Sequence, residues 1–265
     1  MVSDPLFRPV EASYLFIDSV RTAFIEMAEA SGMYLLKKED QNCYNTTTLG
    51  VGEMILDAIN KGAKTIILGI GGSATNDCGM GMASALGYKF EDENGVELSP
   101  VGKNLCLIKN INRNNVLPKL KSVTFKVACD VTNPLFGKDG AAYVYGPQKG
   151  ASDDEIVILD EGLTNISKLF LKAFGKDVQN IKGAGAAGGM GAGSLVFLNA
   201  KLQSGINLVK ELVDFEEKIK NANWIITGEG KLDSQTLSGK TILGVLESAK
   251  KHQISVAALC GSLSL

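Results

Sequence analysis

The chain has 265 residues, of which 45% are hydrophobic and 21% charged, so it is long enough for one large domain or two ordinary ones with an apolar core. Its net charge is −2, and the lack of a basic excess excludes nucleic acid as an expected partner. Five widely spaced cysteines without a CxxC pair argue against a structural zinc site or a disulfide framework. They favour the reducing cytoplasm, and no apolar run is long enough to predict a membrane span.

The hydrophobic pattern predicts alternating strands and helices along most of the chain. Period-2 and short apolar runs indicate strands, whereas apolar residues spaced three and four apart indicate helices. The predicted strands cover residues 10–17, 22–27, 66–68, 88–91, 96–98, 105–111, 123–129, 224–226 and 256–259. One helix is predicted directly after residues 46–48, and further helices are predicted over 153–174, 206–213 and 241–250.

The most informative stretch is T-I-I-L-G-I-G-G-S-A-T-N-D-C-G-M-G, residues 65–81. It predicts a strand, a glycine loop and a helix, an arrangement that presents backbone N–H groups to an anion. Gly71 and Gly72 let a phosphate or carboxylate approach the backbone closely. Ser73, Thr75 and Asn76, followed by Asp77, give more hydrogen-bonding capacity than capping one helix requires. We expect a ligand site here, with a plain tight turn as the alternative.

Two further loops are candidate parts of the same site. Asp130 follows the strand predicted over residues 123–129, where α/β enzymes place ligand-binding groups, with capping of the Asn133-Pro134 turn as the alternative. Gln148 and Lys149 lie in the glycine-bounded loop 146–150, from which a lysine can reach a phosphate. The alternative for Lys149 is a solvated surface side chain.

The segment 183–193, G-A-G-A-A-G-G-M-G-A-G, is a second glycine-rich candidate. It contains a G-x-G-x-x-G pattern, but no convincing strand precedes it, so a Rossmann dinucleotide motif is not favoured. Gly185, Gly188 and Gly189 are predicted to hold a nucleotide or substrate against backbone amides. A flexible linker is the alternative.

The predicted strand 224–226 runs into a polar segment that carries Glu229, Lys231 and Asp233. The two carboxylates are candidate ligands for Mg²⁺, directly or through water, and Lys231 is a candidate phosphate-binding residue. Gly239-Lys240-Thr241 resembles the end of a P-loop, but Ser234 stands where that motif needs glycine, so a P-loop is rejected.

Together these segments resemble the bacterial glycerate kinase family of the glycerate 2-kinase type. The resemblance is carried by G-I-G-G-S-A-T-N-D at 69–77 and covers essentially the whole chain, because further segments match in the same order: Ile25-Glu26-Met27-Ala28, Thr46-Thr47-Thr48, Ala128-Cys129-Asp130, Gly146-Pro147-Gln148-Lys149-Gly150, 183–191 and Thr227-Gly228-Glu229-Gly230. It implies an α/β fold in which one α/β domain is inserted into a flavodoxin-like (Rossmann-like), doubly wound domain, with the active site between them.

We assign residues 1–218 to the inserted mixed α/β domain and residues 219–265 to a partial flavodoxin-like domain.

The sequence departs from the family pattern at both ends. Family members begin with an additional strand and an Asp-Ser-Phe-Lys-Gly segment, and they continue past the position of Leu265. We therefore expect a chain truncated at both ends, with sheet edges that lack partners. We also expect this chain alone to show little or no turnover.

The resemblance implies ATP-dependent phosphorylation of glycerate to 2- or 3-phosphoglycerate in the cytoplasm, with Mg²⁺ as cofactor, and a homo-oligomer is compatible with it. The residues supply suitable parts, because phosphoryl transfer depends on positioning and charge neutralisation. Lys149 and Lys231 can neutralise phosphate charge, and either Asp130 or Asp77 can accept the hydroxyl proton. Asp130 is favoured because it ends a strand.

Two other functions stay open at this point. An NAD(P)-dependent oxidoreductase would use residues 69–74 as a G-x-G-x-x-A fingerprint and needs an acidic residue at the end of a second strand about 20 residues on. Glu91 and Asp92 lie near that distance, but in a predicted hairpin. A non-catalytic module that binds a nucleotide or a carboxylate is the third interpretation.

Overall fold

A computed structural model describes residues 1–233 and 241–264, and the chain divides into two compact units, Met1–Leu202 and Gln203–Leu265. The assignment of an inserted and a partial flavodoxin-like domain stays a prediction. In the part of the chain that is described, no helix combines the length and apolar character needed to cross a bilayer.

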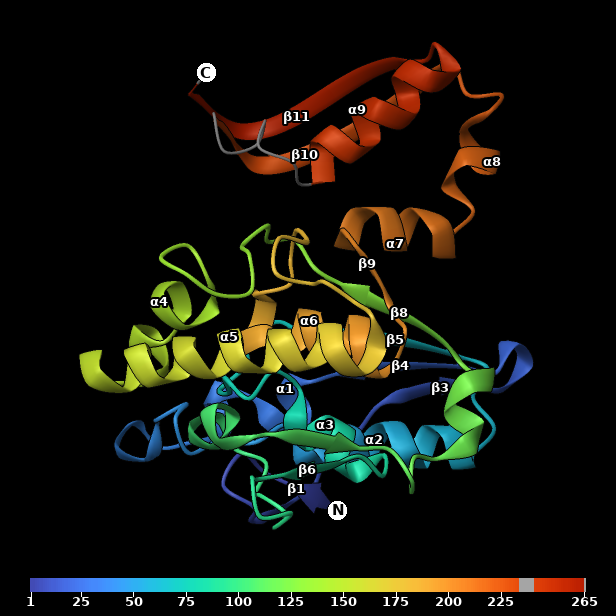
Figure 1. The fold of residues 1–265 in the computed structure, drawn as a ribbon. Coiled ribbons are helices and arrows are strands. Elements are labelled where there is room, and N and C mark those ends of the chain that lie inside the picture. The colour runs from blue at the N-terminus through green and yellow to red at the C-terminus, as the bar shows by residue number, and fades with distance from the viewer. Residues whose placement is uncertain (234–240, 265) are drawn as a thin grey trace. The chain divides into compact units, whose positions relative to one another are not determined.

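A five-stranded sheet forms the centre of the first unit (Figure 1). The order is β3 (Leu15–Ile17), β4 (Thr22–Glu26), β5 (Thr65–Gly69), β8 (Thr124–Ala128) and β9 (Lys201–Gln203). β3 and β4 form the predicted antiparallel hairpin, whereas β4, β5 and β8 are mutually parallel. Their register places Glu26, Gly69 and Ala128 side by side at the carboxyl ends of the three parallel strands.

Helices and short strands complete this unit. The helices are α1 (Ala28–Ser31), α2 (Leu49–Asn60), α3 (Met80–Ala85), α4 (Ala141–Tyr145), α5 (Asp153–Phe174) and α6 (Ala186–Phe197). Of these, α2, α3 and α5 follow the predicted pattern, whereas α4 and α6 were not predicted. Two small antiparallel pairs join β1 (Val2–Ser3) to β2 (Pro9–Val10) and β6 (Lys89–Glu91) to β7 (Asn110–Asn112). Residues 96–98 contribute one bridge at Glu97 rather than the expected strand. Of the strand expected over 105–111, residues 105–107 end a 3-10 helix, Gly102–Leu107, and residues 110–111 belong to β7.

Helix α5 has the predicted bounds, and its ends explain why. Ser152 and Glu155 form a reciprocal capping box at its start, and Gly175, with φ 67°, adopts the left-handed conformation that ends many helices. Its predicted apolar stripe is buried, including Leu159, Leu163 and Phe170. This confirms that the stripe is core.

The described residues of the second unit form a two-stranded parallel sheet with the helices α7 (Gly205–Leu212), α8 (Phe215–Ile219) and α9 (Thr241–His252). β10 (Trp224–Asp233) pairs with β11 (Ser255–Ser264) from end to end, so β10 is longer than the predicted strand 224–226. Ile225 joins Val245 and Ala249 of α9 in a small core. The opposite face carries exposed apolar side chains, with Trp224 63% and Ile226 71% exposed. Parallel sheets usually have both faces covered, so an exposed apolar face is unusual.

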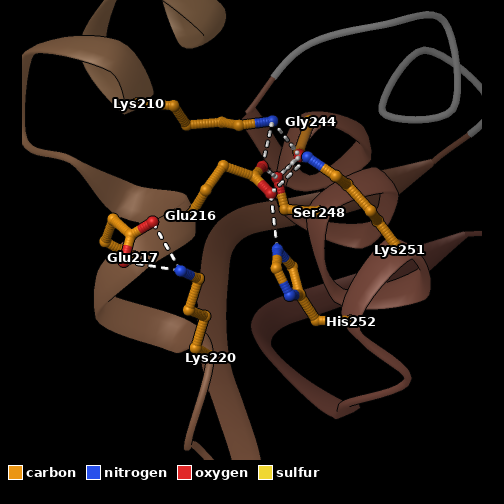
Figure 2. Close-up of polar contacts among 8 residues, drawn as sticks. All are labelled: Lys210, Glu216, Glu217, Lys220, Gly244, Ser248, Lys251 and His252. Carbon is orange, nitrogen blue, oxygen red and sulfur yellow. Dashed lines mark hydrogen bonds and ion pairs between the residues drawn. The ribbon is translucent and has the colours of Figure 1, made fainter.

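Glu216 links the helices of this unit (Figure 2). Its carboxylate accepts a hydrogen bond from Ser248 Oγ at 2.6 Å and contacts His252 Nε2 at 2.7 Å and Lys251 Nζ at 3.1 Å. Lys210 Nζ of α7 lies 3.9 Å from the same carboxylate. The hydrogen bonds from Ser248 and His252 lower the pKa of Glu216 from 4.5 to about 2. His252 ends α9, as the sequence predicted.

The lowered pKa of Glu216 predicts an acid-sensitive second unit. Because the folded-state pKa is depressed, the stabilisation is present above about pH 4.5 and is lost as the pH falls towards 2. Trp224 is the only tryptophan, so its emission during urea unfolding reports this unit. We expect Glu216→Gln to lower the unfolding midpoint at pH 7, and the difference from wild type to shrink at low pH.

The matched control for this experiment is Glu217→Gln. Glu217 belongs to the same helix, but its carboxylate pairs only with Lys220 on an exposed surface in the structure described, so its replacement should change the midpoint little. A difference between wild type and Glu216→Gln that stays constant from about pH 7 to pH 3 would contradict the assignment.

Candidate active site

A cavity of about 600 Å³ opens at the carboxyl ends of the parallel strands of the first unit. Its wall contains the strand-end residues Glu26 and Gly69, the segment after β8 and the loop after β5. Ligands of α/β proteins bind outside the carboxyl ends of parallel strands, and this volume lies in the usual range for small-molecule sites. Six of the predicted site residues line it: Gly71, Gly72, Ser73, Asp130, Gln148 and Lys149.

Lys149 is the buried cation of this cavity. It is 3% exposed, and its Nζ donates hydrogen bonds to Ser73 Oγ at 2.7 Å and to the Thr75 carbonyl oxygen at 2.8 Å. These are two partners, among described residues, for an ammonium that carries three N–H groups. Burial lowers the pKa of Lys149 to about 8, opposed by the nearby Cys43 and Asp77. The solvated surface lysine considered from the sequence is therefore excluded.

Asp77 is fully buried and does not line the cavity. Its carboxylate accepts hydrogen bonds from the N–H and hydroxyl of Thr48, both at 2.8 Å, and from the N–H groups of Gly79 and Gly81 at 3.2 and 3.0 Å. Burial raises its pKa, and these four hydrogen bonds oppose the rise. The expectation that the start of helix α3 offers free N–H groups to an external anion is wrong, because Asp77 occupies that position.

Thr75 and Asn76 also lie beneath the cavity rather than on its wall, and both are fully buried. Thr75 Oγ1 and both polar atoms of the Asn76 side chain have no hydrogen-bond partner among the described residues. Buried polar atoms are usually satisfied, so these three are exceptions within the described part of the chain. Their role in ligand binding stays a prediction.

The glycines of the segment 183–193 pack closely against backbone. A Cβ at Gly188 would overlap the Thr75 carbonyl group, and one at Gly185 would overlap that of Pro134. The N–H of Cys78 donates to the Gly188 carbonyl oxygen at 3.0 Å. Gly185, Gly188 and Gly189 are absent from the cavity wall among described residues, so nucleotide binding by them stays a prediction and close packing is what the structure shows.

The same segment does reach the cavity through Ala187. Its φ of 51° and ψ of 44° lie in the left-handed region, which costs a non-glycine residue about 1 kcal/mol. Strained residues of this kind concentrate at binding sites. The strain therefore supports a functional role for this wall.

Glu26 is the residue that the sequence argument missed. It ends β4, is exposed, and lines the cavity together with Asp130. Its carboxylate lies directly over Gly69, where any Cβ would overlap it, and within the described residues it has no hydrogen-bond or ion-pair partner. A carboxylate at the end of a strand was the signal that selected Asp130, and the same signal was available for Glu26.

The remaining candidates, Glu229, Lys231 and Asp233, belong to β10 of the second unit. Glu229 and Asp233 are four positions apart on a strand, which separates their Cα atoms by about 13 Å. Their role as Mg²⁺ ligands, directly or through water, stays a prediction. Residues 234–240, with the P-loop-like Gly239-Lys240, lie outside the described part of the chain.

Replacement of Asp77 should destabilise the fold strongly. Asp77→Ala leaves four buried donors without an acceptor, so we expect a loss of at least about 3 kcal/mol in the free energy of unfolding. Urea denaturation followed by circular dichroism measures it. Asp92→Ala is the matched control, since Asp92 accepts two backbone N–H groups in an exposed turn and should cost about 1 kcal/mol or less. Equal losses of unfolding free energy in the two variants would show that the hydrogen bonds of Asp77 do not stabilise the fold more than those of an exposed turn.

Comparison with known proteins identifies the family. The pattern of the Glycerate kinase family matches residues 1–265. A glycerate kinase from Halalkalibacterium halodurans is 47% identical over 262 residues, which cover 99% of this chain and 69% of the relative. A glycerate 2-kinase from Escherichia coli K12 is 47% identical over 263 residues, with the same two coverages.

A solved structure agrees with these relatives. A crystal structure from Salmonella typhimurium LT2, described as a glycerate kinase 2, has a TM-score of 0.91 at 42% identity and covers 100% of this chain and 71% of that chain. The α/β fold class predicted from the sequence is thereby confirmed. From the match over its whole length and from these identities, the chain belongs to the glycerate kinase family.

Proposed function

We propose that this chain carries the machinery for ATP-dependent phosphorylation of glycerate. One observation carries the proposal beyond family membership: a single cavity joins an anion-binding wall to two carboxylates. Gly71, Gly72 and Lys149 form the anion-binding wall, and Glu26 and Asp130 are the carboxylates. Phosphoryl transfer needs these two kinds of group, one to neutralise and position charge and one to accept a proton.

Each group has a distinct task in the reaction. Lys149 and the exposed backbone at Gly71 and Gly72 hold the carboxylate of glycerate or a phosphate. Asp130 accepts the proton as a glycerate hydroxyl oxygen bonds to the γ-phosphorus and the bond to the ADP oxygen breaks. ATP and glycerate are the substrates, and we place the enzyme in the cytoplasm, with a homo-oligomer as a compatible state.

Magnesium fits this chemistry. Mg²⁺ is commonly bound by one or two carboxylates together with substrate phosphates, so it needs no dedicated cage of protein ligands. Within the described residues, no three His, Cys, Asp or Glu side chains form a metal-binding group. In the first unit Glu26 would hold the ion, and Glu229 and Asp233 stay the predicted ligands of the second unit. The ion would neutralise phosphate charge.

The oxidoreductase alternative finds no support. Glu91 lies in the antiparallel pair β6–β7 and Asp92 in the following turn, so neither ends a second parallel strand beside β5. Helix α3 begins at Met80, well after the glycine loop, whereas the dinucleotide fingerprint opens directly into its helix.

A coupled assay of ADP release tests the proposal. We expect ADP release from MgATP that depends on D-glycerate, even if the rate is low, together with calorimetric binding of both substrates. NAD as a ligand in place of ATP would favour the oxidoreductase. Binding of ATP and glycerate without any turnover would favour the non-catalytic module.

Replacement of Asp130 tests the proton acceptor. Asp130→Asn should reduce turnover at least ~100-fold, the usual contribution of a general base, while ATP affinity measured by calorimetry stays nearly intact. Glu26→Gln should instead raise the Mg²⁺ concentration that gives half-maximal rate. Glu11→Gln, an exposed carboxylate off the cavity wall, is the control. Near-normal turnover in Asp130→Asn would remove Asp130 from this role.

The pKa of Lys149 predicts a pH dependence of glycerate binding. Its ammonium is charged below about pH 8 and neutral above, so affinity for glycerate should fall as the pH rises through this value. The glycerate carboxylate stays ionised throughout this range. Lys149→Arg keeps the positive charge, so the fall should disappear in this variant. Calorimetry at several pH values measures it, and an unchanged pH profile in a folded Lys149→Arg protein would refute a direct role.

A further inference from the structure

A second, larger cavity of about 830 Å³ lies in the first unit, away from the candidate active site. It includes Val123, Thr124 and Phe125, where β8 begins, whereas the candidate active site lies where β8 ends. No residue is shared between the two linings. The proposed phosphorylation therefore leaves this cavity without a function.

One wall of this second cavity is an aromatic cluster. The rings of Tyr88 and Phe174 pack around Phe197, with centroid distances of 5.0 and 6.0 Å. Phe170 and Phe90 support Phe197 from the core, at 5.2 and 5.7 Å. Tyr88 and Phe197 are almost fully buried and hold the cluster rigid, so the half-buried Phe174 is the ring of this wall that offers surface to a ligand.

The charged residues of the lining all have the same sign. Arg113, Lys121 and Lys201 line the cavity, and among the described residues no aspartate or glutamate does. Each is exposed and has no carboxylate partner in the described part of the chain. In a protein of net charge −2, with 29 acidic residues, three cations around one cavity without a counter-charge leave a positive potential there.

Arg113 is held in place by the aromatic wall. Its guanidinium carbon lies 5.0 Å from the Phe174 ring centroid, in cation–π contact. Burial raises the pKa of Tyr88, and the charge of Arg113 opposes this rise. The positive field of Arg113 therefore reaches the interior of the cluster. A guanidinium fixed on one ring and lacking a carboxylate can still donate hydrogen bonds to an anion.

We propose that this cavity is a binding site for an aromatic organic anion, distinct from the active site. The apolar ring of the ligand packs against the half-buried Phe174, which Tyr88 and Phe197 support from behind, and its negative group pairs with Arg113, supported by Lys121 and Lys201. Neither the aromatic wall nor the three cations suffice alone. The apolar wall does not recognise charge, and exposed cations bind simple ions weakly.

Calorimetric titration of the chain with 1-naphthyl phosphate tests this site. We expect one equivalent to bind, and both 1-naphthol, which lacks the charge, and inorganic phosphate, which lacks the ring, to bind at least about tenfold more weakly. Arg113→Gln should weaken the binding of 1-naphthyl phosphate by about tenfold. Lys109→Gln, an exposed lysine off the cavity wall, should leave it unchanged.

Three results would overturn the proposal. Inorganic phosphate binding as tightly as 1-naphthyl phosphate would show a simple ion site. Unchanged affinity in a folded Arg113→Gln protein, verified by its thermal melt, would place the ligand elsewhere. Loss of binding in Lys149→Met, with Arg113→Gln unaffected, would assign the ligand to the active site, so this result is distinguishable from failure of the proposed phosphorylation.

Discussion

The structure of the first unit depends on one buried carboxylate, that of Asp77. A charge without solvent is costly unless it is fully hydrogen-bonded, and Asp77 meets this condition with four donors from Thr48, Gly79 and Gly81. Thr48 precedes α2, and the two glycines lie at the start of α3, so one acceptor fixes the beginnings of both helices. Lys149 supplies the opposite charge nearby and lines the cavity, whereas Asp77 itself does not.

The burial of Asp77 divides the glycine-rich loop after β5 into two parts. Gly71 and Gly72 stay exposed at the cavity, whereas Thr75 and Asn76 are buried. The buried part packs against the turn at Gly188, where the backbones approach so closely that a Cβ has no room. The polar residues of the loop, which suggest a ligand site when read together, therefore serve two purposes. Only the outer part lines the cavity, and the buried inner part holds it in position.

The second unit relies on a different solution. Its core is small, formed by Ile219, Ile225, Val245 and Ala249, and small cores supply little net stability. The ionic and hydrogen-bonded cluster at Glu216 joins three helices and adds stabilising contacts to those of the small apolar core. One face of β10 and β11 carries exposed apolar side chains. The chain spans 69% of the length of two of its relatives.

The sequence by itself determined the α/β class, the bounds of α5, the β3–β4 hairpin and the family, because periodicity, caps and short motifs are local. It also selected residues that the fold brings to one cavity, notably Asp130 and Lys149, since strand ends and glycine loops gather at one edge of a parallel sheet. Only the tertiary structure decided that Asp77 points inward, that Glu26 joins the cavity and that β10 extends to Asp233. Burial and strand pairing depend on residues distant in the chain, and no local pattern of residue types records them.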